Sequence, residues 1–248
     1  MTGVFITARL GSTRLSEKHL IEVDKKTLIE WLVERFSTAF KEKIESNELK
    51  IFITTSVKAE NKKFESIFDT NEAAVFYGSD ENIPLRHLEC AVANNIDYII
   101  SIDGDDILCS TEASSSIIEK LLSGSHMVQT KGLPLGMNST GYSTLFLESS
   151  LKGIETSKLE TGWGKIFNTA KIDVIQLKSD EKIEEMRMTL DYEPDADFFK
   201  KVISSIDVLN ASDDLLIETI IKNNWNQINE HLNDLYWSNF NKEKKEEN

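Results

Sequence analysis

The feature of this sequence that most restricts its fold is the alternation of short apolar runs with segments of helical periodicity. Short continuous apolar runs are typical of strands buried on both faces. The runs that predict strands are residues 4–7, 50–54, 74–77, 98–102, 127–130, 144–147, 173–177 and 186–190. Alternation of this kind predicts an α/β domain with a mainly parallel sheet. The strands after residue 140 are spaced more like hairpins, so we expect the sheet to be mixed.

The helical segments carry terminal signals that help to place them. A helix is predicted within 27–40, Pro84 is expected to open a second helix at its first position, and Thr111 to cap a third that ends at Gly124. Two further helices are predicted within 212–240. No internal repeat and no linker rich in Pro, Gly or Ser divides the chain, so we expect a single domain over residues 1–240. The charged segment 241–248 lacks apolar residues and is predicted to be a disordered tail.

The overall charge excludes some classes of partner. The 248-residue chain has a net charge of -14, which argues against a nucleic-acid or anionic-membrane surface. It has no apolar run of the roughly 20 residues that span a bilayer and no signal-peptide pattern, so we expect a cytoplasmic protein. Cys90 and Cys109 are expected to be reduced thiols. The scattered histidines and the lack of a CxxC motif argue against a zinc site.

Positive charge is nevertheless concentrated just after the first predicted strand. The sequence VFITARLGSTRLSEKHL, residues 4–20, places Arg9, Gly11, Arg14 and Lys18 in a short loop. Open α/β sheets bind ligands at the carboxyl ends of their strands, and a glycine-containing turn can present backbone N–H groups to an anion. An anionic ligand of such an acidic protein needs local cations, so the loop predicts a phosphate site. It is neither GxxxxGK[ST] nor GxGxxG, and a solvated basic loop is the alternative.

Two other stretches place acids at predicted strand ends. In DYIISIDGDDILCS the apolar run is followed by Asp103, Asp105 and Asp106, which favours an Mg²⁺ site, since Mg²⁺ often takes one or two protein carboxylates together with substrate phosphates. A surface turn is the alternative. In MRMTLDYEPDADFF, Asp191 ends an alternating strand pattern and could reach the same metal, whereas Asp195 suits a helix N-terminus without any function.

Together these stretches resemble a known family. ARLGSTRL followed by Lys18, a strand ending in GD and a later strand ending in LDxxxD are similar to the cytidylyltransferases that make CMP-activated sugar acids, the 3-deoxy-manno-octulosonate and acylneuraminate synthetases. The segment GSDENIPLRHLECA, residues 78–91, most resembles the spore-coat-polysaccharide branch. That branch usually has Asp before the Arg that matches Arg86, where this chain has Leu85. It also usually has a Glu-His pair where this chain has Glu160-Thr161.

The resemblance implies a nucleotide-diphospho-sugar-transferase-like, Rossmann-type α/β fold with a mixed, mainly parallel sheet. It implies that CMP is transferred from CTP to a sugar acid with release of pyrophosphate, for surface-glycan biosynthesis. The residues expected to bind the nucleotide are Ala8, Arg9, Gly11, Ser12, Arg14, Lys18, Ser79, Arg86 and Asp103. Arg14, Lys18 and Asp105 are the expected catalytic residues, and Asp105 and Asp191 the expected Mg²⁺ ligands. The expected substrate residues are Gly136, Asn138, Tyr142, Glu160 and Arg187.

The resemblance also suggests a homodimer, in which residues 132–168 form an insertion for acceptor binding and dimerisation. Trp163 and Phe167 are the aromatic residues expected to be exposed in that segment. Two other functions remain open at this point. One is a catalytically inactive, nucleotide-sugar-binding subunit of a glycan pathway. The other is a glycosyltransferase that uses Asp103-Gly104-Asp105 as a DxD metal motif.

Overall fold

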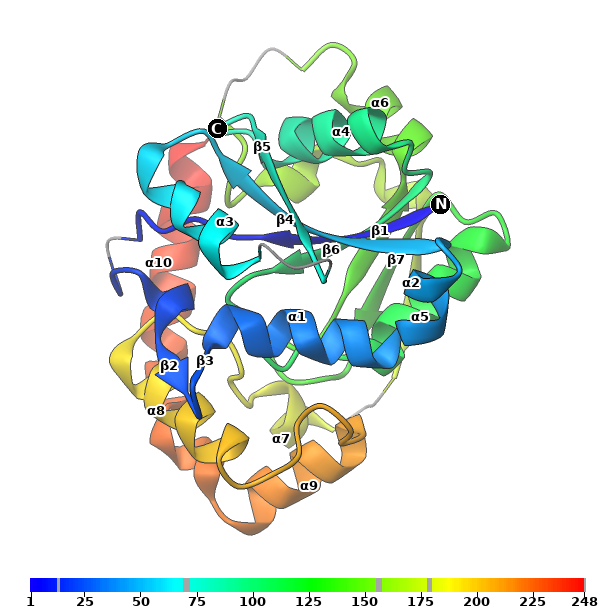
Figure 1. Cartoon of the computed structure of the whole chain (residues 1–248). Helices are drawn as coiled ribbons and strands as arrows, with labels where there is room; N and C mark the ends of the chain where they lie inside the picture. Colours follow the sequence, from blue (N-terminus) through cyan, green and yellow to red (C-terminus); the bar gives the residue numbers. More distant parts are fainter. Residues whose placement is uncertain (13, 69–71, 155–157, 178–179, 248) are drawn as a thin grey trace.

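The computed structural model (Figure 1) describes residues 1–12, 14–68, 72–154, 158–177 and 180–247. Within these residues, seven strands form one sheet in the order β5-β4-β1-β6-β8-β7-β9. Their bounds are β1 Thr2–Thr7, β4 Leu49–Ser56, β5 Ala74–Gly78, β6 Tyr98–Asp103, β7 Met127–Lys131, β8 Thr140–Ser143 and β9 Ile172–Gln176. A separate two-stranded ribbon pairs β2 (Glu22–Val23) with β3 (Lys26–Thr27).

The sheet is mixed and mainly parallel, as predicted. Strands β5, β4, β1 and β6 run parallel, β8 is antiparallel to both β6 and β7, and β9 is parallel to β7. In the central register Thr7 pairs with Thr54 on one side and with Asp103 on the other. The loops that follow β1, β4 and β6 therefore begin side by side at one edge of the sheet.

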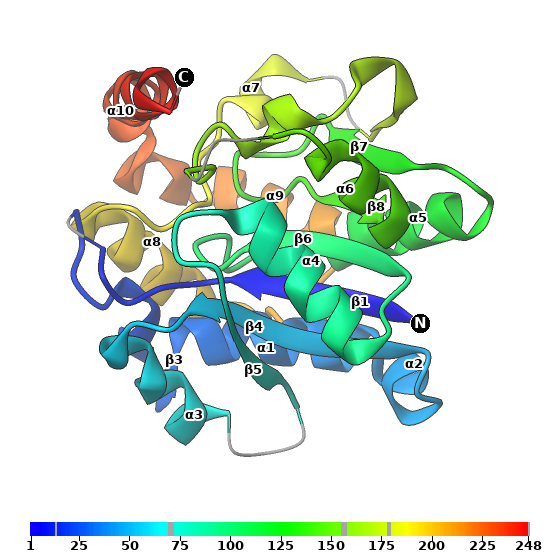
Figure 2. The ribbon, with the colours of Figure 1, turned by 90° about the horizontal axis from the view of Figure 1, so that it is seen from above.

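Helices cover both faces of the sheet (Figures 1 and 2). On one face lie α1 (Leu28–Ala39) and α5 (Thr111–Leu122), and on the other α4 (Ile83–Asn94) and α6 (Thr144–Leu151). Strand β1 serves both layers, because Val4 and Ile6 pack toward α1 and α5 whereas Phe5 packs toward α4. This burial on both sides explains why the strand reads as a continuous apolar run.

A second apolar cluster joins the C-terminal part of the chain to the sheet. It contains side chains of α8 (Glu193–Ile203) and α9 (Asp213–Lys222) together with Met186, Met188 and Leu190. The remaining α-helices are α2 Lys41–Glu45, α3 Lys63–Ile67, α7 Glu181–Glu184 and α10 Asn233–Glu246. Short 3₁₀ turns cover Lys18–Leu20, Ala59–Lys62, Trp163–Ile166, Thr169–Lys171, Trp225–Ile228 and Glu230–Leu232. No helix in the described ranges is both long and apolar enough to cross a bilayer.

Some predicted boundaries were wrong. Residues 144–147, predicted as a strand, begin α6, because the Ser143 hydroxyl accepts from the N–H of Phe146 and caps a helix there. The strand is the preceding segment, β8. Pro84 is the second rather than the first residue of α4, and α5 is capped by Ser110, not Thr111.

The segment 186–190 is extended but does not form a ladder. Arg187 bridges to Leu135, and the N–H of Leu190 donates to the carbonyl of Asp105 at 2.9 Å. This bond places Asp191 next to the end of β6 although 186–190 is not a strand of the sheet.

The C-terminal segment also differs from the prediction. Helix α10 continues through Glu246, and Glu247 is only 7% exposed, so 241–247 are not a disordered tail. Figure 1 shows α10 on the side of the molecule toward which the carboxyl end of β1 points. The segment 132–168, expected as an insertion, contributes β8 to the central sheet.

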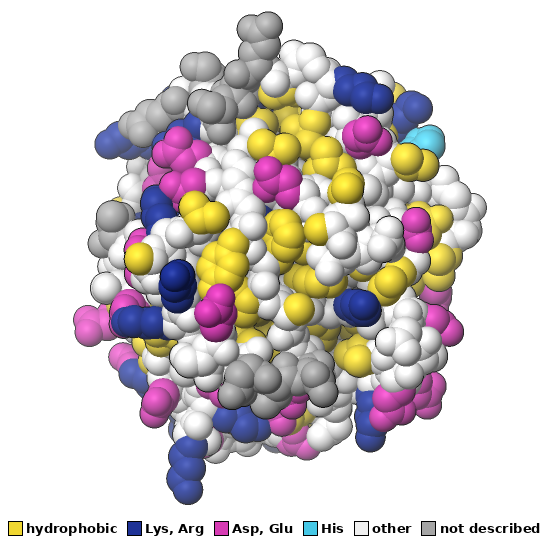
Figure 3. Space-filling view, turned by 45° about the horizontal axis from the view of Figure 1, so that its top comes forward, with side chains coloured by type: hydrophobic (Ala, Val, Ile, Leu, Met, Phe, Trp, Pro, Cys, Tyr) yellow, Lys and Arg dark blue, Asp and Glu magenta, His cyan; other side chains and the backbone are white. Residues whose placement is uncertain are grey.

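One face of the molecule is apolar. Figure 3 shows apolar side chains gathered where α4 and α6 lie. Val92 on α4 and Leu145 on α6 are 67% and 77% exposed. Phe167, expected to be exposed, is instead buried, and Trp163 packs against it in the cluster between α4 and α6.

Candidate active site

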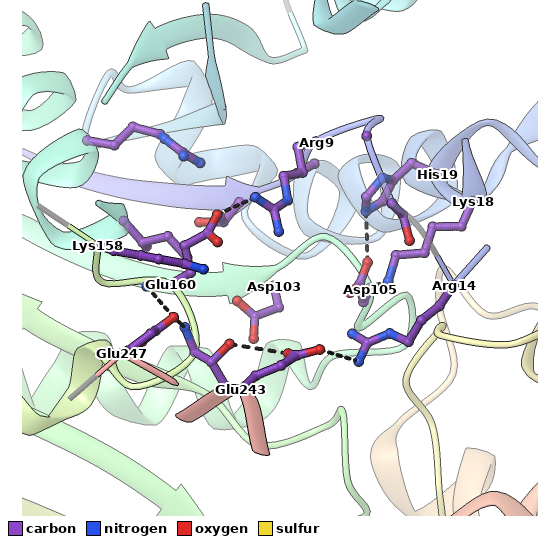
Figure 4. Close-up of a pocket in the computed structure, with 17 residues that line it drawn as sticks. Arg9, Arg14, Lys18, His19, Asp103, Asp105, Lys158, Glu160, Glu243 and Glu247 are labelled. Carbon is purple, nitrogen blue, oxygen red and sulfur yellow. Dashed lines mark hydrogen bonds and ion pairs between the residues drawn. The ribbon is translucent and has the colours of Figure 1, made fainter. Parts of the chain in front are cut away.

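A cleft of about 370 Å³ opens at the carboxyl ends of β1 and β6 (Figure 4). It lies at the edge of the sheet where ligands of open α/β folds bind. Its wall consists of Thr7, Ala8, Arg9, Gly11, Ser12, Arg14, Lys18, His19, Ile83, Arg86, Asp103, Asp105, Lys158, Glu160, Thr161, Glu243 and Glu247. The structure therefore brings together most of the residues predicted to bind a nucleotide.

The loop after β1 is held by the neighbouring strand. The N–H of Ala8 donates to the carbonyl of Thr54 at 3.2 Å, and the N–H of Leu10 donates to buried Asn61 Oδ1 at 2.9 Å. Asn61 in turn donates to the carbonyl of Ser56. The anchoring is thus built from β4 and the turn after it. Gly11 does not adopt a left-handed conformation, and a Cβ there would lie 3.4 Å from Glu60.

Gly104 is the glycine that the site requires. A Cβ on Gly104 would lie 2.9 Å from both the Ala8 Cβ and the Thr7 carbonyl oxygen, closer than real Cβ atoms approach backbone. The N–H of Gly104 donates to that same carbonyl at 2.8 Å. The glycine lets the turn after β6 lie directly against the loop after β1, which places Asp103 and Asp105 beside the cations.

Lys18 joins the two acids that were predicted to share a metal. Its Nζ lies 2.6 Å from Asp105 Oδ2 and 3.3 Å from Asp191 Oδ1. Burial alone would lower the pKa of Lys18, which is 4% exposed, but the two carboxylates more than offset this and raise its pKa above the usual value. Burial likewise opposes ionisation of Asp105, yet Lys18 and His19 together hold the pKa of Asp105 well below its usual range.

Asp103 has a different environment. It faces the open cleft (Figure 4) and forms no ion pair with any other described residue. Desolvation, and then the charge of Asp105, raise the pKa of Asp103 to about 6. Burial and the charge of Asp103 raise the pKa of Asp106 well above its usual range. The negative charge here is therefore only partly compensated by the protein.

Two of the three arginines that line the cleft are paired with acids. Arg14 contacts Asp191 Oδ1 at 3.1 Å and Glu243 Oε1 at 3.2 Å, and Arg9 forms an ion pair with Glu160. Buried Arg86 donates to the carbonyls of Ser79 and Asp80, at 2.7 Å each. Ser79 supports Arg86 from behind and does not line the cleft. Leu85 is partly exposed, on the outer side of the same helix turn.

A second cavity of about 590 Å³ shares a wall with the first. Arg14, Asp103, Asp105, Glu160, Thr161 and Glu243 line both. The second cavity also has Asp106, Leu135, Gly162, Trp163, Gly164, Lys165, Thr189, Asp191, Tyr236, Phe240 and Lys244 in its wall.

A buried ion pair positions Asp191 in that wall. Arg187 donates to Asp191 Oδ2 at 3.0 Å and to both oxygens of Asp195, at 2.8 and 2.9 Å. Asp195 also accepts the N–H groups of Asp191 and Tyr192. Arg187 lies behind Asp191 and lines neither cavity. Asp195 is not only a helix-start acid, because it fixes the loop that carries Asp191.

Besides Arg187, three residues predicted to contact the substrate lie outside both cavities. Gly136 has φ +91° and a Cβ there would collide with the Met188 carbonyl, so it serves a turn. Asn138 hydrogen bonds to Leu133 in that turn. Tyr142 is fully buried, with its hydroxyl 2.7 Å from His87 Nδ1. Residue types alone therefore suggested substrate contacts, whereas the glycine serves a turn and the tyrosine packs in the core.

Several residues of the site were missed by the sequence analysis. His19 lies 2.8 Å from Asp105 Oδ1, and its position directly after Lys18 was the available signal. Thr161 had been noted only as a departure from the family pattern. Glu243 and Glu247 come from the segment expected to be a tail, and nothing in its local pattern indicated that they reach the cleft.

The carboxylate oxygens of the cleft are suited to a hard cation that also binds phosphate. Among the described residues, no three or more His, Cys, Asp or Glu side chains surround one point as a complete metal site. Mg²⁺ needs only one or two protein carboxylates when phosphates and water supply the other ligands. The accessible, incompletely compensated Asp103 beside Asp105 fits that requirement, whereas Lys18 stands between Asp105 and Asp191.

Comparison with known proteins agrees with this geometry. An uncharacterized protein of Methanocaldococcus jannaschii is 26% identical over 223 residues, 88% of this chain and 89% of that protein. A solved cytidylyltransferase from Leptospira borgpetersenii has a TM-score of 0.78 at 23% identity, covering 91% of this chain and 95% of that one. CMP:2-keto-3-deoxy-manno-octonic acid synthetase complexed with CTP has a TM-score of 0.61 at 13% identity, covering 82% and 98%.

These solved structures share the fold of the chain. The sequence itself matches the family model described as cytidylyltransferase over residues 4–152, which include the loop after β1 and the acids after β6. The chain therefore belongs to the cytidylyltransferase family.

Proposed function

We propose that this protein transfers CMP from CTP to a sugar acid of the 3-deoxy-octulosonate or nonulosonate type and releases pyrophosphate. The observation that carries the proposal is the cleft in which Arg9, Arg14 and Lys18 surround Asp103 and Asp105 at the sheet edge. A triphosphate needs clustered cations, and this acidic protein concentrates them there. The resemblance of residues 78–91 to the spore-coat-polysaccharide branch supports a role in surface-glycan synthesis.

The residues of the chain act mainly by binding and orientation. Lys18 is held by Asp105 and Asp191, so its ammonium is fixed where charge develops on the departing pyrophosphate. A preorganised charge of this kind stabilises a transition state without reorganisation at the moment of reaction. Arg14 is more exposed and can turn from Glu243 to a phosphate oxygen. Phosphoryl transfer needs little more than such positioning and charge stabilisation.

We infer that Mg²⁺ is the cofactor. Asp103 and Asp105 would hold it, while Asp191, one of the two expected ligands, stays paired with Lys18. Bound there, the ion would neutralise negative charge on the phosphate groups. A DxD-type glycosyltransferase would use the same two acids of Asp103-Gly104-Asp105 for its metal, and transfer from a nucleotide sugar without pyrophosphate release would favour that function instead.

The second cavity is the proposed acceptor site. It adjoins the nucleotide cleft along Asp103 and Asp105, so an acceptor hydroxyl could approach a phosphate from that side. Tyr236 and Phe240 supply apolar walls for a sugar ring, and Lys165 a positive charge for its carboxylate.

The test is pyrophosphate release with each of the four NTPs against a panel of keto-sugar acids in the presence of Mg²⁺. Release with CTP and one acid is expected. No release with any combination would refute the proposal. Calorimetry distinguishes the enzyme from a catalytically inactive binding subunit, which would bind CTP without turnover.

We also propose that the protein forms a homodimer through the apolar face of α4 and α6. Exposed Val92 and Leu145 support this, since large apolar patches are uncommon on monomers. Light scattering at micromolar concentration should give twice the chain mass of 28.2 kDa. A monomer would contradict the proposal.

A further inference from the structure

Helix α10 and the residue that follows it place two carboxylates in the nucleotide cleft. Glu243 and Glu247 are four residues apart, so they project from the same side of the C-terminal segment. Glu243 contacts Arg14 at 3.2 Å and accepts from the Thr161 hydroxyl at 3.4 Å. Glu247 lies deeper, and Figure 4 shows both side chains reaching the wall that carries Glu160. The cleft is therefore partly filled by the protein's own acids.

The Glu247 carboxylate is held by consecutive backbone donors. The N–H groups of Glu160 and Thr161 donate to its Oε1 at 3.1 and 2.7 Å, and the N–H of Gly162 donates to its Oε2 at 2.6 Å. Successive N–H groups that converge on one oxyanion form an anion-binding concavity, called a nest. We refer to these N–H groups as the 160–162 nest.

Gly162 shapes the nest for close approach. A Cβ on Gly162 would lie 3.1 Å from Glu247 Oε2, tighter than most real Cβ contacts. The φ of Gly162 is −95°, so its backbone does not require glycine. The missing side chain therefore leaves room for the bound oxyanion itself.

The nest stands where the two cavities meet. Glu160 and Thr161 line both cavities, while Glu247 lines the nucleotide cleft and Gly162 the second cavity. The side chain of Glu160, whose N–H is part of the nest, is paired with Arg9. Both substrates of the proposed reaction carry oxyanions, the phosphates of CTP and the carboxylate of the sugar acid.

We propose that the 160–162 nest binds a carboxylate or phosphate oxyanion of a substrate, and that Glu247 fills it in the ligand-free protein. This inference rests on the proposed function for the identity of the substrates. Hydrogen bonds from N–H groups to a charged acceptor are about twice as strong as neutral ones. A tethered carboxylate also competes at an effective concentration in the millimolar range. A substrate oxyanion must therefore displace Glu247, and with it the end of α10.

The experiment compares Glu247→Gln with wild type by calorimetry, and Glu218→Gln is the matched control. Glu218 is exposed on α9, and its substitution removes the same charge far from the cleft. The probes are CTP, inorganic pyrophosphate, N-acetylneuraminate and 3-deoxy-manno-octulosonate. We expect E247Q to bind at least one probe about tenfold more tightly than wild type, and E218Q to match wild type. A gain with CTP or pyrophosphate assigns the nest to phosphate, and a gain with a sugar acid assigns it to carboxylate.

A second substitution tests the nest itself. Gly162→Ala in the E247Q background places a methyl group 3.1 Å from the position of the bound oxygen, a crowded contact, so most of the gained affinity should be lost. Equal affinities of E247Q and E218Q for every probe, or no binding of any probe to E247Q, would overturn the inference. The proposed function is judged separately, because it fails if wild type releases no pyrophosphate even when E247Q binds a probe more tightly.

Discussion

Replacing Lys18 by Met tests whether one buried cation holds the site together. Lys18 is 4% exposed and Asp191 2% exposed, and the ammonium lies within 3.3 Å of carboxylates from two distant segments. Removing one partner of a buried ion pair costs about 3–5 kcal/mol, since the remaining charges are left uncompensated. Asp105 is partly solvated, so we expect a loss of about 3 kcal/mol in unfolding free energy at pH 7.

The loss should depend on pH in a defined direction. The folded pKa of Asp105 lies below its usual value, so its pairing stabilises the protein above about pH 4 and this contribution fades as pH falls through the folded pKa. In K18M the carboxylates of Asp105 and Asp191 lack their cation, and protonation at low pH removes the uncompensated charge. The stability difference between wild type and K18M should therefore shrink between pH 7 and pH 3.

The assay is urea unfolding followed by tryptophan fluorescence at several pH values. Lys41→Met is the matched control, because Lys41 is exposed and pairs only with Glu45 across one helical turn. Such a surface pair contributes about 0–1 kcal/mol. A K18M protein as stable as K41M at pH 7, or a stability loss that does not change with pH, would refute the reasoning.

Four further predictions concern Asp105, Asp103, Gly104 and the two cysteines. Asp105→Asn should lower turnover at least about 100-fold, as for a lost transition-state contact, and should also lower Tm. Asp103→Asn should instead raise Tm at pH 7. The pKa of Asp103 is raised to about 6 in the folded protein, so its ionisation at higher pH opposes folding. A lower Tm for D103N at pH 7 would contradict this. Gly104→Ala should cost about 1–3 kcal/mol of stability and reduce kcat, checked by thermal unfolding and by pyrophosphate release. Unchanged values would show that the turn after β6 tolerates a Cβ. Cys90, whose pKa burial raises to about 12, and Cys109, raised further, should react with a thiol reagent at pH 8 only after denaturation. Reaction of either thiol in the folded protein would disprove their assignment as inert core residues.

The sequence predicted the fold, and most of the residues that gather in the cleft, because both depend on local patterns. The apolar run of β1 and the acids at the end of β6 are contiguous in sequence, and parallel strands bring such ends to one edge. The short apolar run 144–147 was assigned as a strand because periodicity alone cannot separate a short strand from the start of a helix. The Ser143 cap determined the outcome.

The C-terminal side of the site could not be predicted in this way. The composition of 241–248 indicates a solvated tail, and the burial of Glu247 depends on backbone donors 85–87 residues earlier in the chain. Likewise, Tyr142 looked like a substrate contact until its pairing with His87 placed it in the core. Contacts between distant segments carry no local pattern in a single sequence.

The Lys18 bridge has a consequence for how the protein acquires activity during folding. It joins Lys18 to acids that lie 87 and 173 positions further along the chain, so the proposed phosphate site is incomplete in any fragment that lacks them. Contacts of such large sequence separation form slowly, because loop-closure entropy is lost before they stabilise the chain. A nucleotide should therefore recognise only molecules whose folding is finished, and its binding should report the yield of native protein during refolding.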